Sequence, residues 1–181
     1  MPKNDNPHAV RLMDSLVAAG QKEAAETFSE AHPLSKSADF QKKFEWASNL
    51  CTFLDAQFDD GLVKEIRMNC ACGTEMGKAA KLKAIYEKTN DPAVFVEKAN
   101  KLGMGFILAY EDEAFYLIYP ACYCSCVKRV DTPLSKTWCY CTLGYTKRLM
   151  ESVFDRSITV ELISSIKQGD PECRIRITMM E

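Results

Sequence analysis

The sequence predicts an α+β fold: a helical N-terminal half packed on a mostly antiparallel sheet that the C-terminal half forms. Up to about residue 101, apolar residues recur at three- and four-residue steps, which is the spacing of amphipathic helices. From residue 102 they fall in short runs bounded by turn residues, which indicates strands. A chain of 181 residues suits one domain with a full core. We therefore expect a single domain over 1–181, with a helical part (1–101) and a sheet with one inserted helix (102–181).

The helices follow from apolar spacing and from capping residues. Ser37 or Asp39 can cap a long helix to about residue 57. Asp91-Pro92 opens another to about residue 101, because proline after an acidic cap is a good start signal. Thr74 can cap a helix that runs to about residue 88. The complete set of expected helices is 9–19, 21–31, 40–57, 62–68, 75–88, 92–101 and 142–154.

The strands follow from alternation and turns. Residues 105–110 and 114–119 flank the acidic turn Glu111-Asp112-Glu113, and 122–130 reads as a further extended segment. Residues 138–141 fit either a strand end or the start of a helix. Two strands, 158–163 and 172–179, close the chain around a turn at 168–171. A hairpin about 167–168 would place Glu161 opposite Arg174, with Cys173 on the other face beside Leu162 as a core thiol.

Charge and hydropathy exclude two classes of partner. With 23 basic and 25 acidic residues and no basic stripe with interleaved aromatics, we expect no nucleic-acid binding. No apolar run approaches the ~20 residues that cross a bilayer, and the first residues lack the apolar core of a secretion signal. We therefore expect a cytoplasmic protein that binds no membrane and keeps its thiols reduced.

Nine cysteines in a protein with reduced thiols indicate metal binding, nucleophilic chemistry or packing. Five of them fall within 20 residues: Cys122, Cys124, Cys126, Cys139 and Cys141. In a flat strand, residues i and i+2 lie ~6.6 Å apart, so a Cys-x-Cys pair chelates one metal ion only where the backbone turns. If 122–126 paired with 137–141, Cys122 would oppose Cys141 and Cys124 would oppose Cys139 at ~4.5–5.5 Å. These five are candidate zinc ligands. Buried thiols on a pleated face are the alternative.

Three cysteines are candidate nucleophiles. Cys70 and Cys72 lie just before an expected helix N-terminus, a position that lowers the pKa of a thiol, and Cys124 lies in the cluster. Packing under the helix start is the alternative for the first two. A cysteine–histidine pair would have to use His32, because His8 lies near the chain end.

The C-terminal part resembles a known family. Gly144-Tyr145, a helix, Val160-Glu161-Leu162 and then Gly169-Asp170-Pro171-Glu172-Cys173-Arg174-Ile175 resemble the C-terminal signature of the 4-vinyl reductase domain. The resemblance covers about residues 138–178. It implies a small-molecule-binding module, like the aromatic-sensing domains of bacterial transcription activators, with zinc held by cysteines and a glutamate. The matching positions here are Cys139 or Cys141, Glu161 and Cys173, whereas Ser164 and Ser165 stand where a further cysteine is expected.

A second resemblance is to L-2-amino-thiazoline-4-carboxylic acid hydrolase-like proteins, which also combine a helical first half with a cysteine-bearing second half. The leading hypothesis is nevertheless a sensor-like domain that binds a small apolar or aromatic ligand in a pocket beside the cysteine cluster. The expected pocket residues are Phe106, Leu108, Phe115, Leu117, Trp138 and Met150. The alternatives are a cysteine-dependent hydrolase, with Cys70, Cys72 or Cys124 as nucleophile, and a structural domain that forms a homodimer.

Overall fold

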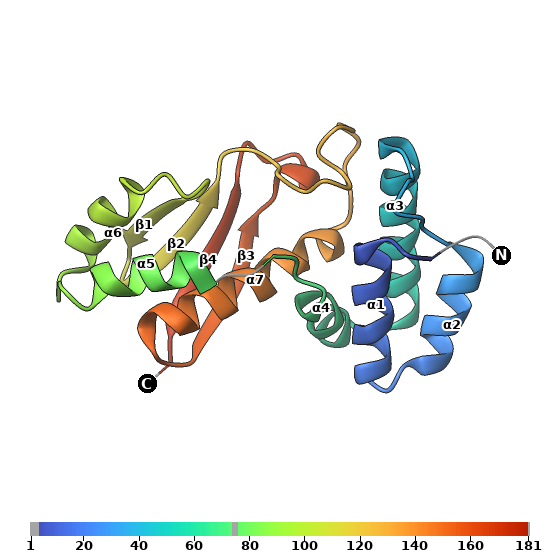
Figure 1. Ribbon diagram of the computed structural model, residues 1–181, viewed down its shortest axis with the longest axis horizontal. Helices are drawn as coiled ribbons and strands as arrows, with labels where there is room; N and C mark the ends of the chain where they lie inside the picture. The colour runs from blue at the N-terminus through green and yellow to red at the C-terminus, as the bar shows by residue number, and fades with distance from the viewer. Residues whose placement is uncertain (1–3, 74–75, 181) are drawn as a thin grey trace. The chain divides into compact units, whose positions relative to one another are not determined.

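The structure is a computed structural model and describes residues 4–73 and 76–180. Their helices and antiparallel strands confirm the α+β class, with helices first and strands toward the C-terminus (Figure 1). The chain divides into two compact units. Unit 1 lies within 1–72 and 123–144, and unit 2 lies within 73–122 and 145–181. No helix of the described residues is both long enough and apolar enough to cross a membrane.

Unit 1 is helical. It contains α1 (Pro7–Ala18), α2 (Lys22–Ala31), α3 (Phe40–Gln57), α4 (Asp60–Asn69) and the first half of α7 (Lys136–Phe154). Polar side chains cap three of these helices, α1, α3 and α4. At the expected cap of α3, the Asp39 carboxylate accepts a hydrogen bond from the Lys42 amide at 2.8 Å. The apolar faces meet in a core that includes Leu12, Leu16, Phe28, Leu50, Leu54, Ile66 and Trp138.

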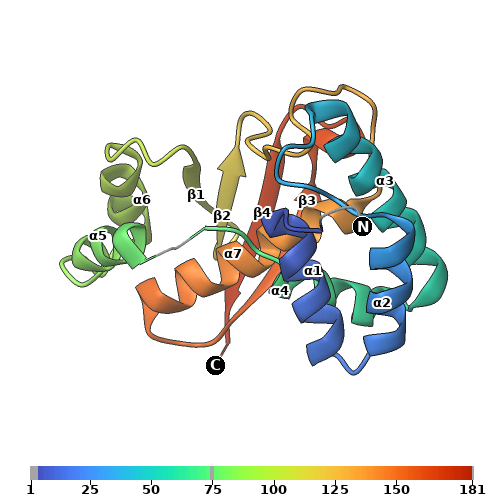
Figure 2. The same ribbon diagram turned by 45° about the vertical axis from the view of Figure 1, so that its right-hand side comes forward.

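Unit 2 contains a four-stranded sheet and the helices that cover one of its faces. Its strands β1 (Ile107–Glu111), β2 (Ala114–Tyr119), β3 (Ile158–Ser164) and β4 (Cys173–Met179) lie in the order β1-β2-β4-β3, as Figure 2 shows. The helices are α5 (Met76–Tyr86), α6 (Pro92–Asn100) and the second half of α7. Phe95 of α6 and Phe154 of α7 both pack on Phe115 of β2, with ring centroids 5.8 and 5.1 Å away. The expected cap Thr74 lies outside the described residues.

The hairpin between β1 and β2 is the one the sequence predicts. Its two turn residues, Asp112 and Glu113, have φ of 48° and 58°, the left-handed pair that suits a two-residue hairpin. In the β3–β4 hairpin the expected register is wrong, because Glu161 pairs with Arg176 rather than Arg174. A short 3-10 turn (Ile166–Gln168) and a bulge between Leu162 and Ser164 shift the pairing.

The segment around the cysteines also differs from expectation. Residues 125–129 form turns rather than a strand, and 136–154 is one continuous helix, so 122–126 and 137–141 do not pair as strands. Helix α7 starts after Ser135, whose side-chain oxygen accepts a hydrogen bond from the Thr137 amide at 3.3 Å. The strand pairing that supported a zinc site is therefore wrong.

Candidate functional site

A turn in unit 1 brings two thiols together. The Cys124 carbonyl accepts hydrogen bonds from the amides of Val127 and Lys128, at 3.2 and 3.0 Å, so the chain folds back directly after Cys124. The side chains of Cys124 and Cys126 then act on each other, which lowers the pKa of Cys124 and raises that of Cys126. Cys124 is half-buried and Cys126 is buried. The two thiols of a Cys-x-Cys pair lie too far apart in a flat strand and come together only where the backbone turns, as it does here.

A buried arginine of α4 lies in the same unit. Arg67 is only 3% exposed, and its Nε and Nη2 donate to the carbonyls of Thr137 and Trp138 at 3.2 and 2.9 Å. Its guanidinium carbon lies 4.8 Å from the centroid of the Trp138 ring, a cation–π contact. Among the described residues, no carboxylate forms an ion pair with it. A buried positive charge without a counter-ion is costly, so this arginine favours negative charge nearby.

Cysteine side chains, rather than carboxylates, surround this arginine. The groups that raise the pKa of Arg67 include the thiols of Cys51, Cys70, Cys124 and Cys141. Burial alone would lower the pKa of Arg67, but these cysteines act in the opposite direction and the net shift is upward. Burial raises the pKa of Cys51 to about 12 and that of Cys141 to about 11, so these two remain neutral thiols.

Cys124 has a different environment. The neighbouring Cys126 side chain, helped by the backbone amides of Cys126 and Val127 and by the indole of Trp138, outweighs burial and lowers the pKa of Cys124 to about 6. Cys124 in turn raises the pKa of Cys126. The indole Nε1 of Trp138 is buried and, among the described residues, has no hydrogen-bond partner of regular geometry. The pair therefore loses its first proton readily from Cys124 and holds the second on Cys126.

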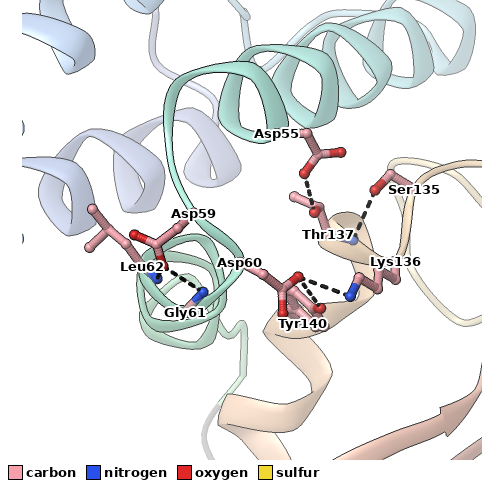
Figure 3. A network of polar contacts seen from close by, with 9 residues as sticks. All are labelled: Asp55, Asp59, Asp60, Gly61, Leu62, Ser135, Lys136, Thr137 and Tyr140. Carbon is pink, nitrogen blue, oxygen red and sulfur yellow. Dashed lines mark hydrogen bonds and ion pairs between the residues drawn. The ribbon is translucent and has the colours of Figure 1, made fainter.

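The first turn of α7, which supplies the carbonyls for Arg67, is anchored to α3 and α4 (Figure 3). Thr137 Oγ1 donates to Asp55 at 2.5 Å, and Asp60 accepts from Tyr140 at 2.8 Å and pairs with Lys136 at 2.9 Å. Hydrogen bonds from Lys136 and Tyr140 hold the pKa of Asp60 below its usual range. These contacts fix the position of the helix start over Arg67.

Gly144 permits the closest approach between α7 and α4. A Cβ at this position would lie 1.9 Å from the carbonyl oxygen of Met68, the residue that follows Arg67. Only a residue without a side chain fits there. The glycine therefore sets the distance across which Arg67 reaches α7.

His8 adds a neutral ring beside these cations. Its Nδ1 lies 3.3 Å from Nη2 of Arg11, and its ring centroid lies 6.2 Å from that of Trp138. Burial, and then the positive charges of Arg11, Arg67 and Lys43, lower the pKa of His8 to about 4. The imidazole is therefore uncharged at neutral pH and leaves a thiolate as the natural partner of the cations.

Comparison with known proteins places the chain in a family. Residues 8–181 match the sequence profile of a family described as "Family of unknown function (DUF6144)". The chain belongs to this family. No curated protein matches the sequence. The resemblance to the 4-vinyl reductase domain is not confirmed.

A comparison with solved structures finds H-NOX proteins among its matches. An H-NOX protein from S. oneidensis in the Fe(II)NO ligation state has 14% identity and a TM-score of 0.45, with 97% of this chain and 99% of that chain covered. A triple mutant of an S. oneidensis H-NOX protein in the Fe(II) state gives 14% identity, a TM-score of 0.46, and coverage of 97% and 96%. The H-NOX domain from Shewanella oneidensis in the Fe(II)CO state gives 14%, 0.45, 97% and 98%. At this similarity, the function of the DUF6144 chain has to be argued from its own residues.

The zinc site expected from the sequence is not supported. Cys124, Cys126, Cys139 and Cys141 fall in unit 1, whereas Cys122 falls in unit 2. In the part of the chain that the structure describes, no three His, Cys, Asp or Glu side chains gather in a group that could hold a metal ion. The Cys141 thiol instead donates to the Trp138 carbonyl at 3.4 Å. Of these five cysteines, Cys124 and Cys141 are among the groups that raise the pKa of Arg67.

The other candidates are the nucleophiles Cys70 and Cys72 and the expected pocket residues, and they differ in burial and in the unit to which they belong. Cys70 is buried and its thiol donates to the Ile66 carbonyl at 3.3 Å, whereas Cys72 is exposed in the segment after α4. Of the expected pocket residues, Trp138 belongs to unit 1 and the others to unit 2. Those in unit 2 are buried in its core or under its helices: Phe106, Leu108, Phe115, Leu117 and Met150. Phe115 also lines a cavity.

Sequence reasoning missed Arg67. Arginines on helices are mostly exposed, so nothing marked this one as a core residue. The signal was its position, since it shares the buried face of α4 with Val63, Ile66 and Cys70 at helical spacing.

Proposed function

We propose that this DUF6144 chain is a thiol-based sensor of small oxidants or electrophiles, with Cys124 as the reacting sulfur and Cys126 as its partner. The observation that carries the proposal is the turn that joins these two thiols beside a buried guanidinium without a carboxylate. A thiolate is the nucleophilic form of cysteine, and electropositive, partly exposed surroundings favour it. Cys124 meets both conditions because it is half-buried and faces hydrogen-bond donors.

With a peroxide as the oxidant, the chemistry balances within the pair. The Cys124 thiolate attacks the terminal peroxide oxygen, the O–O bond breaks, and the leaving oxygen takes a proton to depart as water or an alcohol. The resulting sulfenic acid is attacked by the Cys126 sulfur, which forms a disulfide and releases water. Two thiols are oxidised and one peroxide is reduced. A sensor that reacts in this way is reset by an external thiol.

The hydrolase hypothesis uses the same nucleophile but finds less support. A cysteine hydrolase needs a group that accepts and returns protons beside the sulfur. The groups that lower the pKa of Cys124 include a thiol, an indole and two backbone amides, and none of these is a base. The geometry therefore favours reversible sulfur chemistry over hydrolysis.

Peptide mapping after treatment with hydrogen peroxide tests the proposal. We expect a disulfide between Cys124 and Cys126, seen as the loss of two hydrogens from one peptide, and its return to thiols on reduction. Cys126→Ser should stop at the sulfenic acid, which a dimedone probe captures at Cys124. Cys173→Ser, a change in unit 2, is the matched control and should behave as wild type. Oxidation that appears first at exposed Cys72, or that persists in Cys124→Ser, would refute the assignment.

A further inference from the structure

Unit 2 contains a cavity of ≈460 Å³ that the thiol chemistry does not use. Residues of α5, the β1–β2 hairpin, the end of α7 and β4 line it. This volume is within the range of small-molecule sites, which run from about 300 to 1,000 Å³.

Four aromatic rings form a continuous wall of the cavity. The ring centroids of Phe115 and Phe154 are 5.1 Å apart, that of Tyr86 is 4.8 Å from Phe154, and that of Tyr110 is 4.8 Å from Phe115. Phe115 and Phe154 are buried, whereas Tyr110 is exposed. Aromatic faces attract flat apolar groups and also cations, because their electron density is negative over the ring.

The charged residues of the lining make it acidic. They are one ammonium group, Lys83, and three carboxylates, Glu87, Glu113 and Asp155, so the lining carries two net negative charges. Lys83 is held by Asp155, with Nζ and Oδ2 2.5 Å apart. Among the described residues, Glu87 and Glu113 form no ion pair. The cavity therefore offers two carboxylates and an aromatic wall to a ligand.

Two of these carboxylates stand where the backbone is left-handed. Glu113 has φ of 58° in the β1–β2 turn, and Asp155 has φ of 52° directly after α7. Glycine or asparagine is the usual residue at such turn and helix-end positions. The chain instead places acidic side chains at both, and both line the cavity.

We propose that this cavity binds a small organic cation with an aromatic or apolar body, of which an arylalkylamine is the simplest form. The ring of the ligand packs against Tyr86 and Phe154, and its ammonium group faces Glu87 and Glu113. An anionic ligand is disfavoured because Lys83 is already neutralised by Asp155. The site lies within unit 2, so this inference stands or falls independently of the thiol chemistry of unit 1.

Titration of the full chain, followed by NMR, tests the inference with three probes of one size: phenethylamine, 2-phenylethanol and phenylacetate. We expect phenethylamine to bind about three- to thirtyfold more tightly than the uncharged alcohol, the factor that two partly exposed carboxylates supply. Shifted signals should map to the cavity, and high salt should reduce the preference. Equal binding of all three probes, tighter binding of phenylacetate, or no cavity shifts with any probe would overturn the inference.

Variants identify the groups responsible. Glu87→Gln combined with Glu113→Gln should abolish the preference for the amine, while Glu87→Gln alone, a change at an exposed position of unit 2, should reduce it. Glu97→Gln is the matched control, because this carboxylate pairs with Lys101 on α6 and does not line the cavity. A preference that survives the double change, or that Glu97→Gln lowers equally, would also overturn the inference.

Discussion

Replacing Gly144 by alanine tests the geometry that holds Arg67 in place. The new Cβ would lie 1.9 Å from the Met68 carbonyl oxygen and 2.7 Å from its carbonyl carbon, and both are backbone atoms that cannot rotate away. Since Cβ contacts essentially never fall below 3.0 Å, α7 and α4 have to separate locally by about 1 Å. The hydrogen bonds from Arg67 to α7, now 3.2 and 2.9 Å long, would be stretched or lost.

The magnitude follows from opposing terms. Overpacking costs about 1–3 kcal/mol, and weakening hydrogen bonds from a charged group adds about 1.5–3 kcal/mol. Alanine in place of glycine favours the helix by about 1 kcal/mol. Gly144→Ala should therefore destabilise the protein by about 1.5–5 kcal/mol, a large part of the ~5–15 kcal/mol of a typical domain.

Urea unfolding followed by circular dichroism measures this effect. Gly77→Ala is the matched control, because Gly77 lies in α5 and a Cβ there would meet nothing within 4 Å. We expect the control to be neutral or stabilising by up to ~1 kcal/mol. If Gly144→Ala had wild-type stability, α4 and α7 would not approach closely at Gly144, and the proposed role of this glycine would be wrong.

Three further predictions concern single residues. The unfolded chain protonates His8 at about pH 6.5, whereas the folded chain does so only at about 4, so the stability that neutral His8 contributes is full above pH 6.5 and is lost as the pH falls to 4. In urea unfolding of His8→Gln, the free energy of unfolding should therefore change less steeply with pH between 6.5 and 4 than in the wild-type protein. The same steepness in both proteins would contradict this. Asn100 binds both the amide and the carbonyl of Leu108 at 2.8 Å, so Asn100→Ala should cost about 1–3 kcal/mol and speed hydrogen exchange in β1, whereas Asn90→Ala should not. Asp39→Ala should cost about 1 kcal/mol through its lost cap, measured by thermal unfolding, and no loss would argue against that cap.

Local signals predicted most of the secondary structure. The helix over 40–57 follows from the Asp39 cap and a long apolar face, and the β1–β2 hairpin follows from two apolar runs around an acidic turn. Their determinants are close in sequence, so they can be recognised without tertiary information. The prediction that 122–130 is extended was wrong. Cysteines that alternate with Tyr123 and Ser125 resemble a strand pattern, whereas hydrogen bonds to the Cys124 carbonyl fold the chain into a turn.

The site itself was predicted only in part. Cys124 was a candidate nucleophile, but its low pKa depends on Trp138, which is fourteen positions away in sequence, and on a turn that the pattern concealed. Arg67 was missed because a buried cation is exceptional and its partners are carbonyls of a distant helix. The expected pocket is not supported, and the physical reason is related: inward-facing residues such as Leu117 fill the core before they line a cavity.

The rate of alkylation as a function of pH tests whether Cys124 is the reactive thiol with a lowered pKa. Dilute iodoacetamide is added to the native protein between about pH 4 and 9, and peptide mapping gives the rate at each cysteine. We expect Cys124 to react first, with a rate that rises through an apparent pKa of about 6 and is nearly constant above neutral pH. Arg67→Met should move this midpoint upward, toward the ~8.5 of an ordinary thiol. A Cys124 rate that still rises through ~8.5 in the wild-type protein, or faster labelling of Cys72, would contradict it.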